Sequence, residues 1–80
     1  MQTLNYVHRL QREVNHRMRY YSLKVYKTLF NEYILESEYG SMKNKHPTGC
    51  KRDYFITLQE TLVARAMKIQ VKIKKGYKYV

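Results

Sequence analysis

The sequence contains few residues that form turns or cross-links: among 80 residues there are one cysteine, one proline and three glycines. It contains no tryptophan. Cys50 alone cannot form an intramolecular disulfide, so nothing indicates an oxidising compartment. No segment approaches the ~20 apolar residues needed to cross a bilayer, and the N-terminus lacks the apolar run of a signal peptide. We therefore expect a cytoplasmic protein without a membrane partner.

Length sets a second limit. A chain of 80 residues buries about 60% of the surface that it exposes when unfolded, which is enough for one hydrophobic core and too little for two. The sequence therefore predicts a single domain spanning residues 1–80.

Acidic residues are also scarce. Six Asp and Glu face sixteen Lys and Arg, which gives a formal net charge of +10. Such an excess attracts polyanions and says little about the fold. Nucleic acid is the first partner to consider, an anionic membrane surface the second and an acidic protein the third; the membrane ranks low because the apolar stripe of the predicted helix is needed to pack on the sheet.

What the chain has in abundance is tyrosine, with nine Tyr against two Phe. Tyrosine buries area and keeps a polar tip, which suits half-covered sheets and contact surfaces. Alternation of apolar and polar residues, with period two, predicts strands at residues 3–10, 17–26, 31–41 and 50–56. Polar residues 11–15 read as the first connection, and the segment around Pro47 and Gly49 reads as an exposed loop.

The clearest local signal is a helix at residues 58–75. Thr57 and Glu60 have the spacing of a capping box, and Gly76 is placed to end the helix in a left-handed conformation. An apolar stripe at three- and four-residue steps predicts the buried face, which consists of Leu58, Leu62, Ala66, Ile69 and Ile73. Basic residues are expected on the other face, namely Arg65, Lys68, Lys72 and Lys75. The tail 77–80 is expected either to return as an edge strand or to pack its tyrosines.

These elements predict the α+β class, with an antiparallel sheet of four or five strands and one long C-terminal helix packed on one face. In this order the chain resembles the WGR domain family. The family's aromatic-Tyr strand, Leu-Phe-Gly-Glu-Trp step, Trp-Gly-Arg signature and Lys-x-Gly-Tyr end correspond to residues 19–21, 28–33, 39–41 and 74–77. The similarity extends from about residue 4 to residue 77.

The resemblance implies DNA binding. WGR domains of DNA-dependent poly(ADP-ribose) polymerases bind DNA breaks, with the signature tryptophan against the sugar of the terminal nucleotide. By position, Tyr39 takes the place of that tryptophan, Gly40 is retained and Ser41 replaces the arginine. Tyrosine keeps a stacking ring, whereas serine lacks the charge and the five donors of arginine. The resemblance therefore implies general binding of DNA near ends or distortions.

Basic residues close to this signature form the predicted site. Phosphates attract such groups without sequence preference, and a neighbouring ring suits an unpaired base or an exposed end. The expected nucleic-acid-binding residues are Tyr39, Gly40, Ser41, Lys43, Lys45, Lys51, Arg52, Arg17 and Arg19. An alternative interpretation is that the lysines only solvate a loop and that Tyr39 belongs to a cross-strand pair.

Other chemistry has less support in the sequence. His46 and Cys50 are four residues apart, but a structural zinc site needs four ligands, and catalysis needs a nucleophile with a base and an orienting group. We expect no enzymatic activity, metal or cofactor. The competing hypothesis is a protein interaction module, in which the tyrosines contact an acidic partner or a second copy to give a homodimer.

Overall fold

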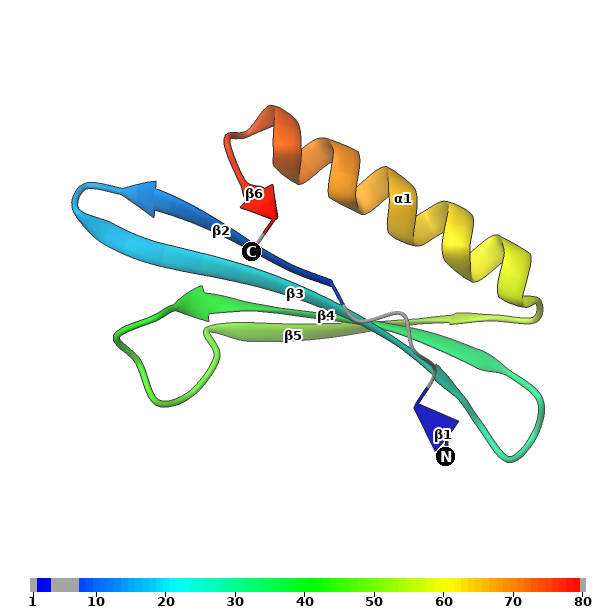
Figure 1. Cartoon of the computed structure of the whole chain (residues 1–80). Helices are drawn as coiled ribbons and strands as arrows, with labels where there is room; N and C mark the ends of the chain where they lie inside the picture. Colours follow the sequence, from blue (N-terminus) through cyan, green and yellow to red (C-terminus); the bar gives the residue numbers. More distant parts are fainter. Residues whose placement is uncertain (1, 4–7, 80) are drawn as a thin grey trace.

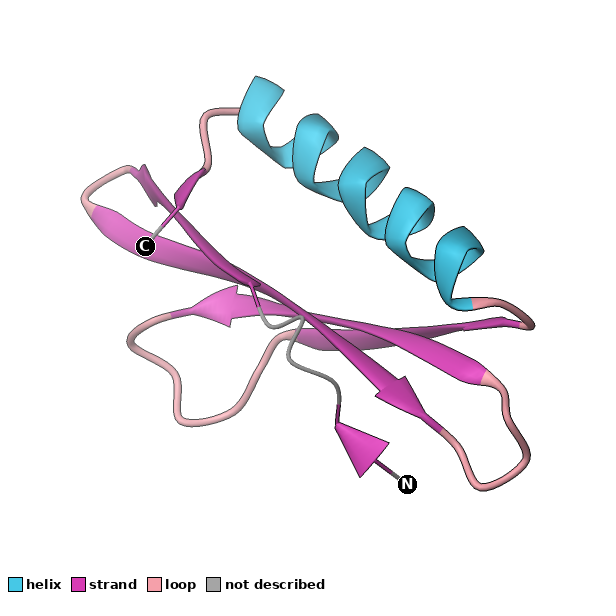
Figure 2. Cartoon of the chain, turned by 45° about the vertical axis from the view of Figure 1, so that its right-hand side comes forward, coloured by secondary structure: helices cyan, strands magenta, loops and turns pink. Residues whose placement is uncertain are grey.

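The computed structural model describes residues 2–3 and 8–79. Its strands form one antiparallel sheet in the order β5-β4-β3-β2-β6, with the two-residue β1 (Gln2–Thr3) paired to β3. A single helix, α1, crosses one face of this sheet, and the opposite face has no second layer in the described residues (Figures 1 and 2). The predicted α+β class is confirmed, with the antiparallel sheet and the long C-terminal helix.

The first hairpin joins β2 (His8–Val14) to β3 (Arg17–Lys27). Its two-residue turn, Asn15 and His16, has positive φ at both positions, as a type I′ turn requires. The prediction of a polar connection at residues 11–15 is wrong, because Gln11 to Val14 pair with β3 and only Asn15 belongs to the turn. The strand predicted at residues 3–10 lies partly outside the described residues.

The next two strands, β4 (Tyr33–Ser41) and β5 (Gly49–Phe55), agree closely with the predicted ones. The turn that leads into β4 is held by Thr28, whose Oγ1 accepts hydrogen bonds from the amides of Phe30 and Glu32 at 3.2 and 3.1 Å. Asn31 takes a positive φ of 61° in this turn, a conformation that asparagine tolerates better than most residues.

Helix α1 (Leu58–Lys74) begins where the capping signal predicts. The Oγ1 of Thr57 accepts a hydrogen bond from the amide of Glu60 at 3.1 Å, which satisfies one of the free donors of the first turn. Gly76 ends the helix with a φ of +104°. The chain then returns as β6 (Lys78–Tyr79), which pairs with Leu10 and Gln11 at the edge of the sheet.

The core lies between α1 and one face of the sheet. Side chains of directly opposed residues in antiparallel strands share a face, so the cross-strand register identifies the covered side. On that side the buried cluster comprises Leu10, Tyr21, Leu23, Val25, Leu35 and Ile69. The covered face therefore includes the odd-numbered residues of β3 and β4.

The helix is rotated from the predicted orientation. Ile69 and Thr61 are buried and Leu58 packs against the core, but Ala66 is exposed and Ile73 is 44% exposed. The expected apolar stripe is thus only partly the buried face. Thr61 is fully buried. Its burial costs little, because its hydroxyl donates a hydrogen bond to the carbonyl of Thr57 at 2.8 Å.

The prediction that the basic residues of the helix face away from the sheet is wrong for three of them. Arg65 and Lys68 are half-buried and reach polar groups on the sheet, where Arg65 contacts the ring of His8 and Lys68 pairs with Asp53 at 3.2 Å. Lys72 is also half-buried, over aromatic rings. These partners make the half-burial of cationic side chains tolerable.

Candidate nucleic-acid interface

Tyr39 lies on the covered face, near the end of the sheet at which helix α1 terminates. It is directly opposite Tyr21 on β3 and Gly49 on β5. Its ring is stacked with that of Tyr21, with centroids 6.3 Å apart and planes 16° from parallel, and is 43% exposed. The phenol occupies the space where a side chain at Gly49 would stand. Glycine at this position therefore allows the ring to lean across β5.

Two arginines extend the same face beyond Tyr39. Arg19 is directly opposite Ser41 on one side and Arg12 on the other, and the next covered-face pair is Arg17 with Val14. Arg17 and Arg19 are exposed. Like charges directly opposite one another destabilise a sheet, so the hairpin carries an electrostatic cost at Arg12 and Arg19.

The end of helix α1 adds cations to this hairpin. The Nζ of Lys72 lies 4.5 Å from the centroid of Tyr21 and 5.6 Å from that of Tyr77, and the guanidinium of Arg12 lies 5.9 Å from the same Tyr77 ring. Burial, together with the charges of Lys75, Lys68 and Arg12, holds the pKa of Lys72 below its ordinary value. Burial is the largest cause of this shift, and the neighbouring cations lower the pKa further.

We call this region the cationic end; it comprises Arg12, Arg17, Arg19, Lys72 and Lys75 together with the rings of Tyr21, Tyr39 and Tyr77. Of the six acidic residues of the chain, only Glu13 lies close to the cationic end in the described structure, where it lines one surface hollow together with Arg12 and Lys75. By strand register Glu13, Glu36 and Glu38 are on the uncovered face, Asp53 pairs with Lys68, and Glu32 and Glu60 belong to the turn before β4 and to the first turn of α1.

Gly40 explains how the loop between β4 and β5 closes. A side chain here would meet the backbone nitrogen of Thr48 at 2.9 Å and the Cα of Pro47 at 3.3 Å. The Thr48 amide also donates to the carbonyl of Tyr39 at 2.8 Å. The loop thus folds against Gly40 on the uncovered side, and it carries the exposed Lys43 and Lys45.

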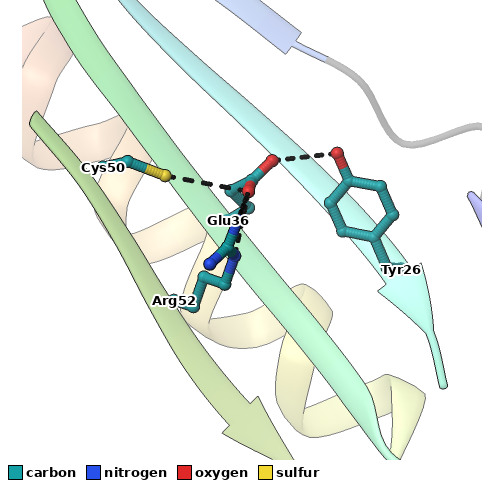
Figure 3. Close-up of polar contacts among 4 residues, drawn as sticks. All are labelled: Tyr26, Glu36, Cys50 and Arg52. Atoms are coloured by element: carbon teal, nitrogen blue, oxygen red, sulfur yellow. Dashed lines mark hydrogen bonds and ion pairs between the residues drawn. The ribbon is translucent and has the colours of Figure 1, made fainter. Parts of the chain in front are cut away.

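Arg52 lies on the uncovered face, opposite to the one that carries Tyr39, Arg17 and Arg19. There its Nη2 pairs with Glu36 Oε1 at 3.0 Å, and Tyr26 donates to the other carboxylate oxygen at 2.9 Å (Figure 3). Burial raises the pKa of Glu36, but the hydrogen bonds from Tyr26 and Arg52 lower it by more, so the pKa lies below its ordinary value. Glu36 therefore holds Arg52 in an intramolecular cluster.

Cys50 belongs to the same cluster and has no features of a reactive thiol. Its Sγ lies 3.7 Å from Glu36 Oε1, and burial together with the charge of Glu36 raises the pKa of the thiol. A raised pKa keeps the thiolate, which is the nucleophilic and metal-binding form, at low population.

The structure thus brings five predicted residues to one face: Tyr39, Ser41, Arg17, Arg19 and Lys51, the last by its register with Ser37. Gly40 and Arg52 lie on the other face. Sequence reasoning missed Arg12, Lys72 and Tyr77. The signal available for Lys72 and Tyr77 was the basic end of the helix followed by an aromatic tail, but it did not indicate which side of the helix faces the sheet.

The histidines and acidic residues of the described chain do not gather as metal ligands. Within residues 2–3 and 8–79, no three His, Cys, Asp or Glu side chains lie close enough together to hold an ion. His8 instead contacts Arg65 and the ring of Tyr79. No helix in the same residues combines the length and apolar character needed to cross a membrane.

Comparison of the chain with protein-family models, with curated proteins and with solved structures gave no match. The geometry of the cationic end and the sequence pattern therefore indicate the function of this protein.

Proposed function

We propose that this protein is a non-enzymatic, WGR-like module that binds nucleic acid, with double-stranded DNA near ends or distortions as its target and the cationic end as its contact surface. Phosphates would contact Arg17 and Arg19 of the cationic end and Lys51 beside it on the same face, and the half-exposed ring of Tyr39 would meet a sugar or an unpaired base.

One observation carries this proposal: on the covered face the fold gathers like charges with no carboxylate among them in the described residues, since the nearby Glu13 is on the uncovered face. Arg12 and Arg19 are directly opposite one another, and the pKa of Lys72 is depressed partly by Lys75 and Arg12. A bound polyanion would relieve this repulsion, and it would release counterions when its phosphates are neutralised. Solubility requires only that charges be spread over the surface. It does not explain a repulsive cluster of cations at one end of a domain.

The aromatic residues support the same function. Tyr39 is fixed by its stacking on Tyr21 and by its position over Gly49, and it keeps 43% of its surface exposed. A positioned ring beside cations is the usual platform for stacking with nucleic acid. The WGR-like sequence pattern puts Tyr39 at the signature position of that family, which supports the same role independently of the charge argument.

The test is binding of a short labelled DNA duplex, measured by fluorescence anisotropy over a series of salt concentrations. We expect a slope of several units in log K against log salt, since each phosphate contact contributes about 0.9. Linear DNA should compete better than closed circular DNA.

Two double variants with the same change in net charge separate a local surface from general charge. Arg17→Gln with Arg19→Gln removes two cations of the cationic end. It should lower the slope of log K against log salt by the contribution of about two phosphate contacts. Arg9→Gln with Lys24→Gln removes two cations from the uncovered face and should change little. Equal losses in both variants, or no salt dependence, would contradict the proposal, and a co-purifying acidic protein would favour the interaction-module alternative.

A further inference from the structure

Strand β5 is an exposed edge. It pairs with β4 on one side and is the last strand of the sheet in the described structure, so its outer backbone groups are free to pair with another strand. Natural proteins usually protect such edges with charged side chains, inward-pointing charges or a covering loop. Strand β5 carries the charged residues Lys51, Arg52 and Asp53. They do not block pairing with a second strand, because one register places opposite charges together.

An apolar strip on the helix runs above this edge. Val63, Met67 and Val71 follow one another at four-residue steps and are 54%, 63% and 51% exposed. Between the helix and Phe55 lies an open surface hollow of about 400 Å³, which Val63, Ala64 and Met67 help to line. An unpaired strand edge beside an exposed apolar strip has the composition of an interface core.

We propose that a second copy of this chain occupies the edge, with β5 pairing antiparallel to β5 of the other copy about a two-fold axis at Arg52. This register keeps both helices on the same face of a continuous sheet, because residues equally far from Arg52 on the two strands become direct partners and share a face. The apolar strips of the two helices then border the same interface.

Charge complementarity selects a second copy over another partner. In this register Lys51 of each copy is directly opposite Asp53 of the other, which gives two symmetric ion pairs on the covered face. Asp53 has Lys68 at 3.2 Å within its own chain and keeps room to accept a second cation, since its side chain is 29% exposed. The two copies of Arg52 meet on the axis, and each is already paired with its own Glu36.

Shape is complementary at the ends of the paired strands. Phe55 of one copy is directly opposite Gly49 of the other, where no side chain of residue 49 obstructs it. The Phe55 ring then meets the half-exposed Tyr39 that leans across that glycine, so a second copy and a nucleic acid would compete for this ring. Aromatic pairing across a glycine is a known means of stabilising adjacent strands.

The net charge of +10 per chain does not prevent this association, because the cationic ends lie far from the axis. Arg19 is level with residue 47 in the register, five residues or about 17 Å along the strand from Arg52. The antiparallel arrangement sends the two cationic ends in opposite directions, so the two copies of Arg19 are separated by about 34 Å along the strands. This is several Debye lengths at physiological salt.

Sedimentation equilibrium of the protein without nucleic acid tests the proposal, and its outcome is independent of DNA binding. The wild-type chain should show a reversible monomer–dimer equilibrium that weakens moderately with added salt, because salt screens the two Lys51–Asp53 pairs. Lys51→Asp and Asp53→Lys should each raise the dimer dissociation constant about tenfold, since two cross-strand pairs become repulsive. An equimolar mixture of the two variants should dimerise again, because both cross-strand pairs of the mixed dimer then join a carboxylate to an ammonium group.

Two further variants test the helix strip. Met67→Asp should weaken the dimer without unfolding the monomer, because its side chain is largely exposed. Leu29→Asp, at an 85% exposed residue in the turn between β3 and β4, is the control and should leave the equilibrium unchanged; circular dichroism verifies that every variant is folded. A wild-type chain that stays monomeric at every concentration, or variants that fail to recover dimers on mixing, would overturn the proposal.

Discussion

Replacing Arg19 by glutamate should stabilise the protein and weaken its binding to nucleic acid at the same time. Arg19 is directly opposite Arg12, so the substitution converts a repulsive cross-strand pair into an attractive one. Each such pair contributes about 0.2–1 kcal/mol, and reversal of the sign gives a gain of about 1 kcal/mol. For a domain of this size that gain raises the melting temperature by about 4–8 °C.

The loss of binding can be estimated from counterion release. One phosphate contact contributes a slope of about 0.9, which corresponds to a factor of about eight in affinity at 0.1 M salt relative to 1 M. Thermal unfolding followed by circular dichroism measures the first effect, and anisotropy with labelled duplex DNA measures the second.

Arg17→Glu is the matched control, because Arg17 has Val14 and no cation opposite it. This variant carries the same change in charge and should lose similar affinity, but it should gain much less stability. If Arg19→Glu destabilises the fold, or if both variants bind DNA as well as the wild type, the reasoning about uncompensated charge fails.

Other predictions follow from single contacts. Gly49→Ala should displace Tyr39 and cost about 1 kcal/mol in urea unfolding, whereas the same change in a Tyr39→Ala background should cost almost nothing. Burial lowers the pKa of His8, so the unfolded chain binds its proton more readily and stability should fall as pH drops through the ordinary value of 6.5; His8→Phe should remove this slope. The pKa of Glu36 lies below its usual value, partly through Tyr26, so this contribution is present at neutral pH and lost as pH falls through the lowered pKa. Tyr26→Phe should therefore cost about 1–2 kcal/mol near pH 7 and much less in acid.

The sequence predicts the order and type of the elements because their signals are local. The alternation in β3 and β4, the cap at Thr57 and the glycine at Gly76 each depend on residues close in the chain. The turn at Asn15 and His16 is harder to place, since the polar residues before it resemble a loop. Their polarity instead reflects a strand whose one face is uncovered and whose edge is only partly paired.

The candidate site is harder to predict because its parts come from distant segments. Alternation assigns Tyr39 and Arg19 to strands, but only the register shows that they share a face and that Arg52 does not. The orientation of α1 depends on partners such as Asp53, which lies 15 residues before Lys68 and attracts it toward the sheet. Apolar periodicity alone carries no information about such pairs.

The cap at Thr57 also fixes the position at which α1 begins, and therefore where each later residue of the helix lies along the sheet. The helix starts three residues after β5 ends, and its 17 residues advance about 25 Å, so the distance from the cap determines where Lys72 meets Tyr21. Removing one turn would keep the apolar phase nearly intact but withdraw the lysines by about 5 Å. Helix length therefore determines where the lysines lie over the hairpin. The cap that fixes the start of the helix, at Thr57, lies at the opposite end of the sheet.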